Sequence, residues 1–106
     1  MARRRRLFTV QSPLGYRVFL DRDRWRQIVR YKHPALANRE KDVRACLVSP
    51  SLIRESSKDS DVHMYYVSAD GIHLCVVAAP ADKVEYFVVT AYYTTNIKQG
   101  KELWKS

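Results

Sequence analysis

Three arginines and one histidine recur at steps of four, four and three residues, in the order Arg22, Arg26, Arg30 and His33. Side chains at these steps project from one stripe of a helix. Arginines in such a stripe can contact consecutive phosphates, and an imidazole with an ordinary pKa of about 6.5 can give or take a proton at neutral pH. A charged helix face that only meets solvent has the same spacing. This pattern therefore leaves both interpretations open.

A second candidate group lies on the strand predicted over residues 84–94. Alternation along a strand places one set of side chains on the same face, here Val84, Tyr86, Val88, Thr90 and Tyr92. The hydroxyl of Thr90 can donate to a phosphate and the ring of Tyr92 can stack on a base, a combination that suits single-stranded RNA. β-Prone residues that simply fill a sheet account for the same pair.

The remaining tyrosine pair and two further histidines fall in predicted strands. Tyr65 and Tyr66 point to opposite faces, so at most one of them can join the surface of Thr90 and Tyr92, and Tyr66 is our candidate. His63 and His73 are expected to be structural, since histidines in strands are commonly part-buried.

Neither the cysteines nor the histidines have metal-binding spacing. Cys46 and Cys75 lack any CxxC or Cys/His pattern, which predicts two buried free thiols. A zinc site needs four clustered ligands, and the three histidines are scattered. The acidic residues form no cluster for a two-metal centre. We expect no metal and no other cofactor.

The elements that position these residues follow from turn and capping signals. Runs at 7–10 and 16–20 flank Ser12-Pro13-Leu14-Gly15, which predicts a β-hairpin. Asp21 is the predicted N-cap of a helix over residues 22–32. Pro34 should break that helix at His33 and open the next, although Asn38 is an alternative N-cap. The second helix should end near Ser49-Pro50.

Beyond Pro50 the pattern changes to short β-prone runs joined by tight turns. Strands are predicted over residues 52–54, 62–68, 72–79 and 84–94, with turns at Asp70-Gly71 and Pro80-Ala81-Asp82-Lys83. Hairpin-length connections require antiparallel pairing, and Trp104 should fold back to bury its ring. The predicted fold is α+β: two N-terminal helices packed on a four-stranded antiparallel sheet, preceded by a short β-hairpin.

Length, charge and hydropathy bound the functional class. The chain has 106 residues, 46% of them hydrophobic, and a net charge of +8, which predicts one domain over residues 7–106 after a flexible basic arm over residues 1–6. The charge favours polyanionic partners, and we rank nucleic acid above an anionic membrane or an acidic protein. No run is long and apolar enough for a transmembrane helix, and the start lacks signal-peptide character, so cytoplasmic localisation is expected.

Several short motifs follow one another in an order that is also found in a known protein family. These motifs are His33-Pro34 closing a helix that contains Trp25, the strand start Pro50-Ser51-Leu52-Ile53-Arg54, Tyr65-Tyr66, and Thr90-Ala91-Tyr92 followed by Lys98-Gln99-Gly100 and Trp104. From Tyr16 to Trp104 the chain resembles the phage-associated branch of the barnase/EndoU/colicin/RelE-like nuclease superfamily. The resemblance implies N-terminal helices on a four-stranded antiparallel sheet and RNA cleavage without a metal.

The resemblance also implies roles for individual residues. His33 matches the histidine of the family, Thr90 and Tyr92 match the end of its last strand, and Lys98 matches its Lys-x-Gly. The implied reaction is attack of a ribose 2′-OH on the adjacent phosphate, with His33 as general base or acid. Ala35 stands where the family often has glutamate, so that carboxylate has no counterpart here.

Four further contributions complete this expected site. Arg30 and Arg54 would stabilise the charge that develops on the phosphate. Thr90 would orient a phosphate oxygen, and Tyr92 would stack on a base or donate its hydroxyl. The residues expected to bind nucleic acid are Arg22, Arg26, Arg30, Tyr66 and Lys98.

Three hypotheses about function follow. The first is a small metal-independent endoribonuclease, either a toxin or a phage-derived effector. The second is an inactive relative that binds RNA or DNA through the same face. The third is a protein-interaction domain whose basic face meets an acidic antitoxin, an inhibitor protein or a virion component.

Overall fold

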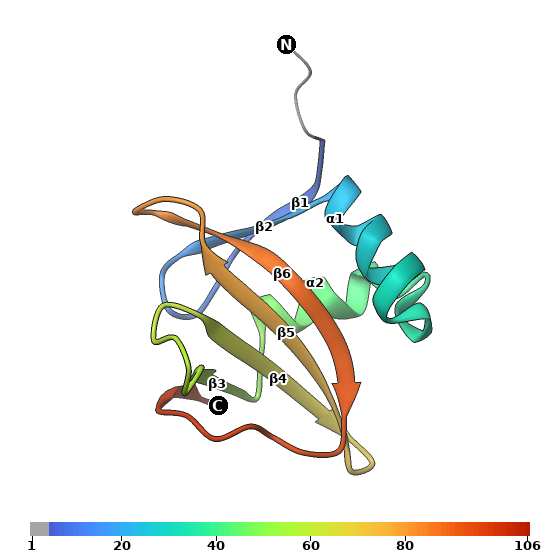
Figure 1. The fold of residues 1–106 in the computed structure, drawn as a ribbon. Helices are drawn as coiled ribbons and strands as arrows, with labels where there is room; N and C mark the ends of the chain where they lie inside the picture. The colour runs from blue at the N-terminus through green and yellow to red at the C-terminus, as the bar shows by residue number, and fades with distance from the viewer. Residues whose placement is uncertain (1–4) are drawn as a thin grey trace.

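Seven strands of the described residues, 5–106, form one mixed sheet in the order β1-β2-β6-β5-β4-β3-β7 in a computed structural model (Figure 1). The strands are β1 (Arg6–Gln11), β2 (Arg17–Asp21), β3 (Leu52–Glu55), β4 (His63–Ala69), β5 (Ile72–Pro80), β6 (Glu85–Thr94) and β7 (Glu102–Lys105). The helical segments are α1 (Arg22–Gln27), the π-helix η1 (Ile28–Lys32), the 3-10 helix η2 (Pro34–Leu36) and α2 (Glu40–Val48). The expected basic arm falls mainly on residues 1–4, which lie outside the described residues, while Arg6 already belongs to β1.

The predicted fold class is wrong: the sheet is mixed and has seven strands, whereas a four-stranded antiparallel sheet was expected. Strands β3 to β6 do pair antiparallel in chain order, but they are the centre of a larger sheet. The N-terminal hairpin is part of that sheet because β2 pairs with β6 in parallel, from Arg17 opposite Glu85 to Phe19 opposite Phe87. On the other side β7 pairs with β3. The helical layer consists of two short α-helices and two brief helical segments.

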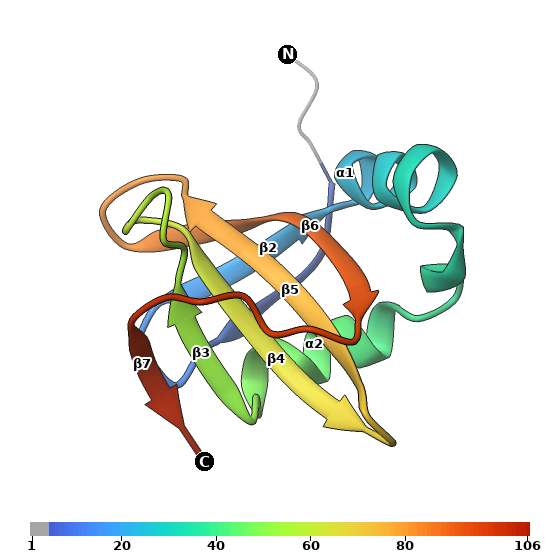
Figure 2. The same cartoon turned by 60° about the horizontal axis from the view of Figure 1, so that its bottom comes forward.

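The main core lies between the helical segments and one face of the sheet. Its fully buried members include Leu20 from β2, Ile28 from η1, Leu47 from α2 and Tyr65 from β4. Trp25 fixes the two helices to each other, since its indole Nε1 donates to Glu40 Oε1 at 2.8 Å. Figure 2 shows α2 behind the sheet and the C-terminal segment crossing in front of it. None of the described helices is long and apolar enough to cross a membrane.

A β-bulge in β6 changes which side chains share a face. The partner register jumps from Thr90 opposite Val77 to Val88 opposite Ala78, so Val89 is an extra residue. As a result Tyr86 and Val88 belong to the core under the helices, whereas Tyr92 packs in a second cluster on the outer face. The prediction that Val84, Tyr86, Val88, Thr90 and Tyr92 share one face is therefore wrong, although Thr90 and Tyr92 do remain neighbours.

His63 lies buried in an aromatic stack near the end of the core. Its ring is 4.7 Å from that of Tyr86, nearly parallel at 17°, and 6.1 Å from that of Tyr16. Burial lowers its pKa below the usual value, while Glu55 and Asp61 act in the opposite direction. The folded state therefore prefers the neutral imidazole.

We expect this histidine to make stability depend on pH. Because the folded pKa lies below the unfolded one, the contribution is complete above the unfolded pKa of about 6.5 and declines as the pH falls towards the folded pKa. Urea unfolding at pH 7.5 and pH 5 should show a larger loss of unfolding free energy for the wild type than for His63→Phe, which keeps a ring in the stack. Equal losses in the two proteins would contradict this assignment.

Candidate nucleic-acid interface

A turn of π-helix positions His33. The backbone N–H of His33 donates to the carbonyl of Ile28 at 2.7 Å, five residues earlier, and His33 itself leaves helical geometry at φ −139° and ψ 74°. The ring of Pro34 disfavours helical backbone at His33, so the break falls where the sequence predicts it. Single π-turns of this kind often occur at functional sites. The half-buried imidazole thus lies directly at the end of this helical segment.

The imidazole of His33 meets the ring of Tyr92 across an open part of the sheet edge. Strand β2 pairs with β6 only as far as Phe87, and the helical segment that starts with α1 runs beside the rest of β6 (Figure 1). The two ring centroids are 5.7 Å apart and the ring planes are inclined by 37°. Residues separated by more than half of the chain are thereby brought into contact.

Two cross-strand rows form the outer face of the sheet around Tyr92. The register places Arg54, Met64, Val77 and Thr90 in one row, and Leu52, Tyr66, Cys75 and Tyr92 in the next. The second row is apolar at its centre, where Tyr66 and Cys75 are fully buried. This small outer cluster also contains Ile97, from the segment that crosses the sheet.

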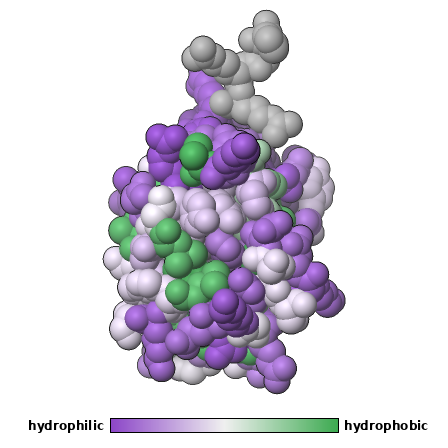
Figure 3. Space-filling view, turned by 90° about the vertical axis from the view of Figure 1, so that its left-hand side faces the viewer, coloured by the Kyte–Doolittle hydropathy of each residue, from purple (hydrophilic) through white to green (hydrophobic). Residues whose placement is uncertain are grey.

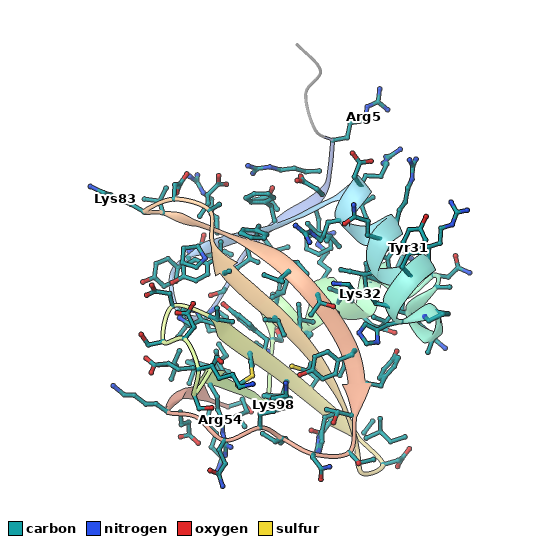
Figure 4. All side chains as sticks on the ribbon, viewed as in Figure 1. Arg5, Tyr31, Lys32, Arg54, Lys83 and Lys98 are labelled. Carbon is teal, nitrogen blue, oxygen red and sulfur yellow. The ribbon has the colours of Figure 1, made fainter. Side chains whose placement is uncertain are left out.

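That crossing segment, residues 95–101, is called the strap below. The backbone N–H of Lys98 donates to the hydroxyl of Tyr66 at 3.2 Å, and Arg54 Nη1 donates to the carbonyl of Lys98 at 3.0 Å. Lys98 Nζ lies 5.7 Å from the ring centroid of Tyr92. Figure 4 shows Lys98 and Arg54 together on this side, with Lys32 on the helical segment beyond β6. The strap therefore adds a lysine to the surroundings of Tyr92.

A cavity of about 260 Å³ opens beside the strap. Its lining includes Thr90 and Tyr92 from β6, Lys98 from the strap, and Ser57 and Lys58 from the loop before β4. Two lysines and the serine hydroxyls of the loop make this cavity suited to a phosphate. Lys58 is not among the residues predicted from the sequence, because the sequence around a lysine in a polar loop does not indicate which part of the fold the lysine will face.

The hydroxyl groups of Thr90 and Tyr92 are buried beneath this surface. Within residues 5–106 neither Thr90 Oγ1 nor the Tyr92 hydroxyl has a hydrogen-bond partner of acceptable geometry. Burial, with the Cys75 thiol beside it, raises the pKa of Tyr92 above its usual value, and burial raises the pKa of Tyr66 to about 12. Both phenols are therefore protonated at neutral pH, and the Tyr92 ring rather than its hydroxyl is the accessible group.

The predicted site residues divide into three sets. Thr90, Tyr92 and Lys98 line the cavity beside the strap, and His33 contacts the ring of Tyr92 but does not line that cavity. Arg54 and Tyr66 hold the strap, and the Tyr66 ring is fully buried. The helix arginines lie apart from the cavity: Arg26 is 3.9 Å from the carboxylate of Asp23, and Arg30 lies over the ring of Tyr31 at 5.4 Å.

The predicted structural residues also have defined places. His73 pairs with the hydroxyl of Ser68 and lies opposite Thr94, in the cross-strand row next to that of Tyr92. Trp104 packs against the core from β7. Cys46 and Cys75 are free and buried. Over the described range 5–106, no group of three or more His, Cys, Asp or Glu residues is arranged to hold a metal ion.

No protein-family model, curated protein or solved structure matches this chain. The resemblance to the nuclease superfamily therefore rests on the sequence motifs alone, and the functional argument rests on the geometry around Tyr92.

Proposed function

We propose that this protein is a small metal-independent endoribonuclease that cleaves single-stranded RNA in the cytoplasm. The observation that carries the proposal is the contact of the His33 imidazole with the Tyr92 ring, 5.7 Å away, at a point where Lys98 also approaches that ring. A proton-transfer group, a stacking surface and a cation are the three components that such a reaction needs.

The proposed reaction uses the ribose of the substrate as nucleophile. A nucleotide whose base stacks on Tyr92 would place the 2′-OH of its ribose near His33. The imidazole accepts the proton of this hydroxyl as the 2′-oxygen attacks the adjacent phosphorus. The bond from phosphorus to the 5′-oxygen breaks, the leaving oxygen takes up a proton from water, and the product is a 2′,3′-cyclic phosphate. Lys98 and Lys58 would balance the negative charge that builds up on the phosphate.

The structure changes the expected contributions of two residues in this scheme. The Thr90 hydroxyl is buried and therefore presents no donor to a phosphate in this structure. Arg54 acts by holding the carbonyl of Lys98, so we assign it as a positioning residue. Arg30, one helical turn before His33, is exposed and remains available to the substrate.

The test is cleavage of a labelled single-stranded RNA in EDTA, with DNA of the same sequence as the matched substrate. The proposal expects cleavage of the RNA alone, because DNA lacks the nucleophile. Cleavage of both substrates, or of neither, would refute a reaction that depends on the 2′-OH.

A second candidate is a protein that binds single-stranded nucleic acid without cleaving it. The burial of the Thr90 and Tyr92 hydroxyls favours it, because those donors are withdrawn from a substrate. If Arg22, Arg26, Arg30 and Lys98 contact phosphates, raising the salt from 50 to 200 mM should weaken binding by about 50-fold, at a slope of about −0.7 per contact. Strong binding with this salt dependence and no cleavage would support it, whereas affinity independent of salt would exclude it.

A further inference from the structure

A second cavity, of about 470 Å³, opens where β2 and β6 meet the start of α1. Phe19 and Phe87 both line it and face each other across the parallel strand pair. Their ring centroids are 6.5 Å apart. Both rings are only partly buried, because they lie on the face of these strands that points away from the core. Two phenyl rings kept partly exposed in one cavity form a surface on which a flat ligand can stack.

Each ring of this pair has a guanidinium next to it. Arg6 Cζ lies 3.7 Å from the centroid of Phe19, and Arg6 is held there by two hydrogen bonds to Glu85, at 2.9 and 3.2 Å. Arg24 Cζ lies 5.8 Å from the centroid of Phe87, and Arg24 also lines the cavity. Because Arg6 already covers Phe19, the ring of Phe87 is the one left for a ligand.

The polar groups of the cavity fit a nucleotide in one orientation. The carboxylate of Asp23 and the amide of Gln27 are on the wall, and these acceptors suit the exocyclic amines of a base. They repel a phosphate, which should instead lie at Arg24. A nucleotide would therefore enter with its base inward and its phosphate at the rim.

The cavity and the candidate interface lie along the same strand, β6. Because of the bulge at Val89, Phe87 and Tyr92 are both on the outer side of β6, about 16 Å apart along the strand at about 3.3 Å per residue. The two rings are thus positioned for different bases of one extended strand. Figure 3 shows that the side of the molecule that faces left in Figure 1 is largely hydrophilic, with an apolar area near its centre and smaller ones around it.

We propose that this cavity is a second base-binding subsite for single-stranded RNA, with Phe87 as the stacking surface and Arg24 as the phosphate contact. This inference rests on the proposed function, since it supplies the substrate of that site with a second point of attachment several nucleotides away. Such a subsite would favour an extended strand over a single nucleotide.

The experiment measures binding of a fluorescein-labelled eight-nucleotide 2′-O-methyl RNA, which cannot be cleaved by attack of its own 2′-OH. Phe87→Leu should weaken binding about tenfold, since stacking on an aromatic side chain contributes about 1–3 kcal/mol per base. Arg24→Gln should weaken it about fivefold. Tyr93→Leu, on the opposite face of β6, and Lys83→Gln, in the exposed β5–β6 turn, are the matched controls and should bind like the wild type.

The outcomes separate this inference from the proposed function. If the wild type binds the RNA and both Phe87→Leu and Arg24→Gln bind it equally well, the subsite is refuted and the proposed function stands. If the wild type binds no RNA, both fail. If adenosine monophosphate binds the wild type as tightly as the octamer does, the cavity is a mononucleotide site and the inference is wrong. Should Phe87→Leu not fold, Arg24→Gln, a surface change, decides the matter.

Discussion

Replacing His33 with alanine should lower the rate of RNA cleavage by about 10²- to 10⁴-fold, the range for loss of a general acid or base. His33 is the histidine in ring contact with Tyr92, and the other two are a buried member of an aromatic stack and a partner of Ser68. Single-turnover cleavage in EDTA measures the effect. The affinity for uncleavable RNA should change little, because the proposed role of the imidazole is proton transfer.

The matched control for this substitution is His73→Ala. His73 is also partly exposed and lies opposite Thr94, in the cross-strand row next to that of Tyr92, but its ring is hydrogen-bonded to Ser68 rather than in contact with Tyr92, so its loss should leave cleavage at the wild-type rate. Equal activity of His33→Ala and the wild type would remove His33 from the mechanism. Equal losses in both variants would contradict a role in proton transfer that belongs to His33 alone.

Replacing Gly100 with alanine should destabilise the attachment of the strap by about 3 kcal/mol, the upper part of the range for overpacking. A Cβ at this position would overlap the backbone carbonyl of Glu55, which cannot rotate away as a side chain can. The strap would have to separate from β3, with loss of the bond from Glu55 N to Lys101 O and of the contacts that position Lys98. Urea unfolding measures the destabilisation, and hydrogen exchange at Glu55 reports the local separation.

Gly15→Ala provides the control for Gly100→Ala. Gly15 has a positive φ of 91° but open space where a Cβ would stand, so its substitution should cost about 1 kcal/mol from backbone strain alone. A destabilisation by Gly100→Ala no larger than that of Gly15→Ala would contradict the close approach of the strap to β3.

Local sequence signals located the elements of this fold well. The predicted strands at 72–79 and 84–94 correspond to β5 and β6 within one residue at each end, because their turn is marked by Pro80 and Asp82. Asp70 and Gly71 both have positive φ, as their turn requires. The predicted helix over residues 22–32 also forms, with its second half as the π-helix η1.

The arrangement of the sheet was not predictable in this way. The parallel pairing of β2 with β6 joins residues that are far apart in sequence, and no local pattern specifies such a partner. The bulge at Val89 is equally hidden, because its two neighbours are β-prone residues like the rest of β6. One extra residue was enough to move Tyr86 and Val88 to the face opposite Tyr92.

For the candidate site, the sequence identified which residues could take part, but not the distances between them. His33 stood out by its position before Pro34, and Tyr92 by its place near the end of a strand. Their contact arises because β2 leaves part of the β6 edge open to the helical segment, which is a property of the whole sheet. Tyr66 shows the opposite case: its type suggested a stacking surface, but its register buries it under the strap.

The most direct test of the central claim, that His33 activates a 2′-OH beside Tyr92 without a metal, uses a DNA strand that contains a single ribonucleotide. In EDTA the wild type should cut only on the 3′ side of that ribose and leave a 2′,3′-cyclic phosphate, detected by mass spectrometry. Cutting at deoxy positions, or an intact strand, would contradict the account.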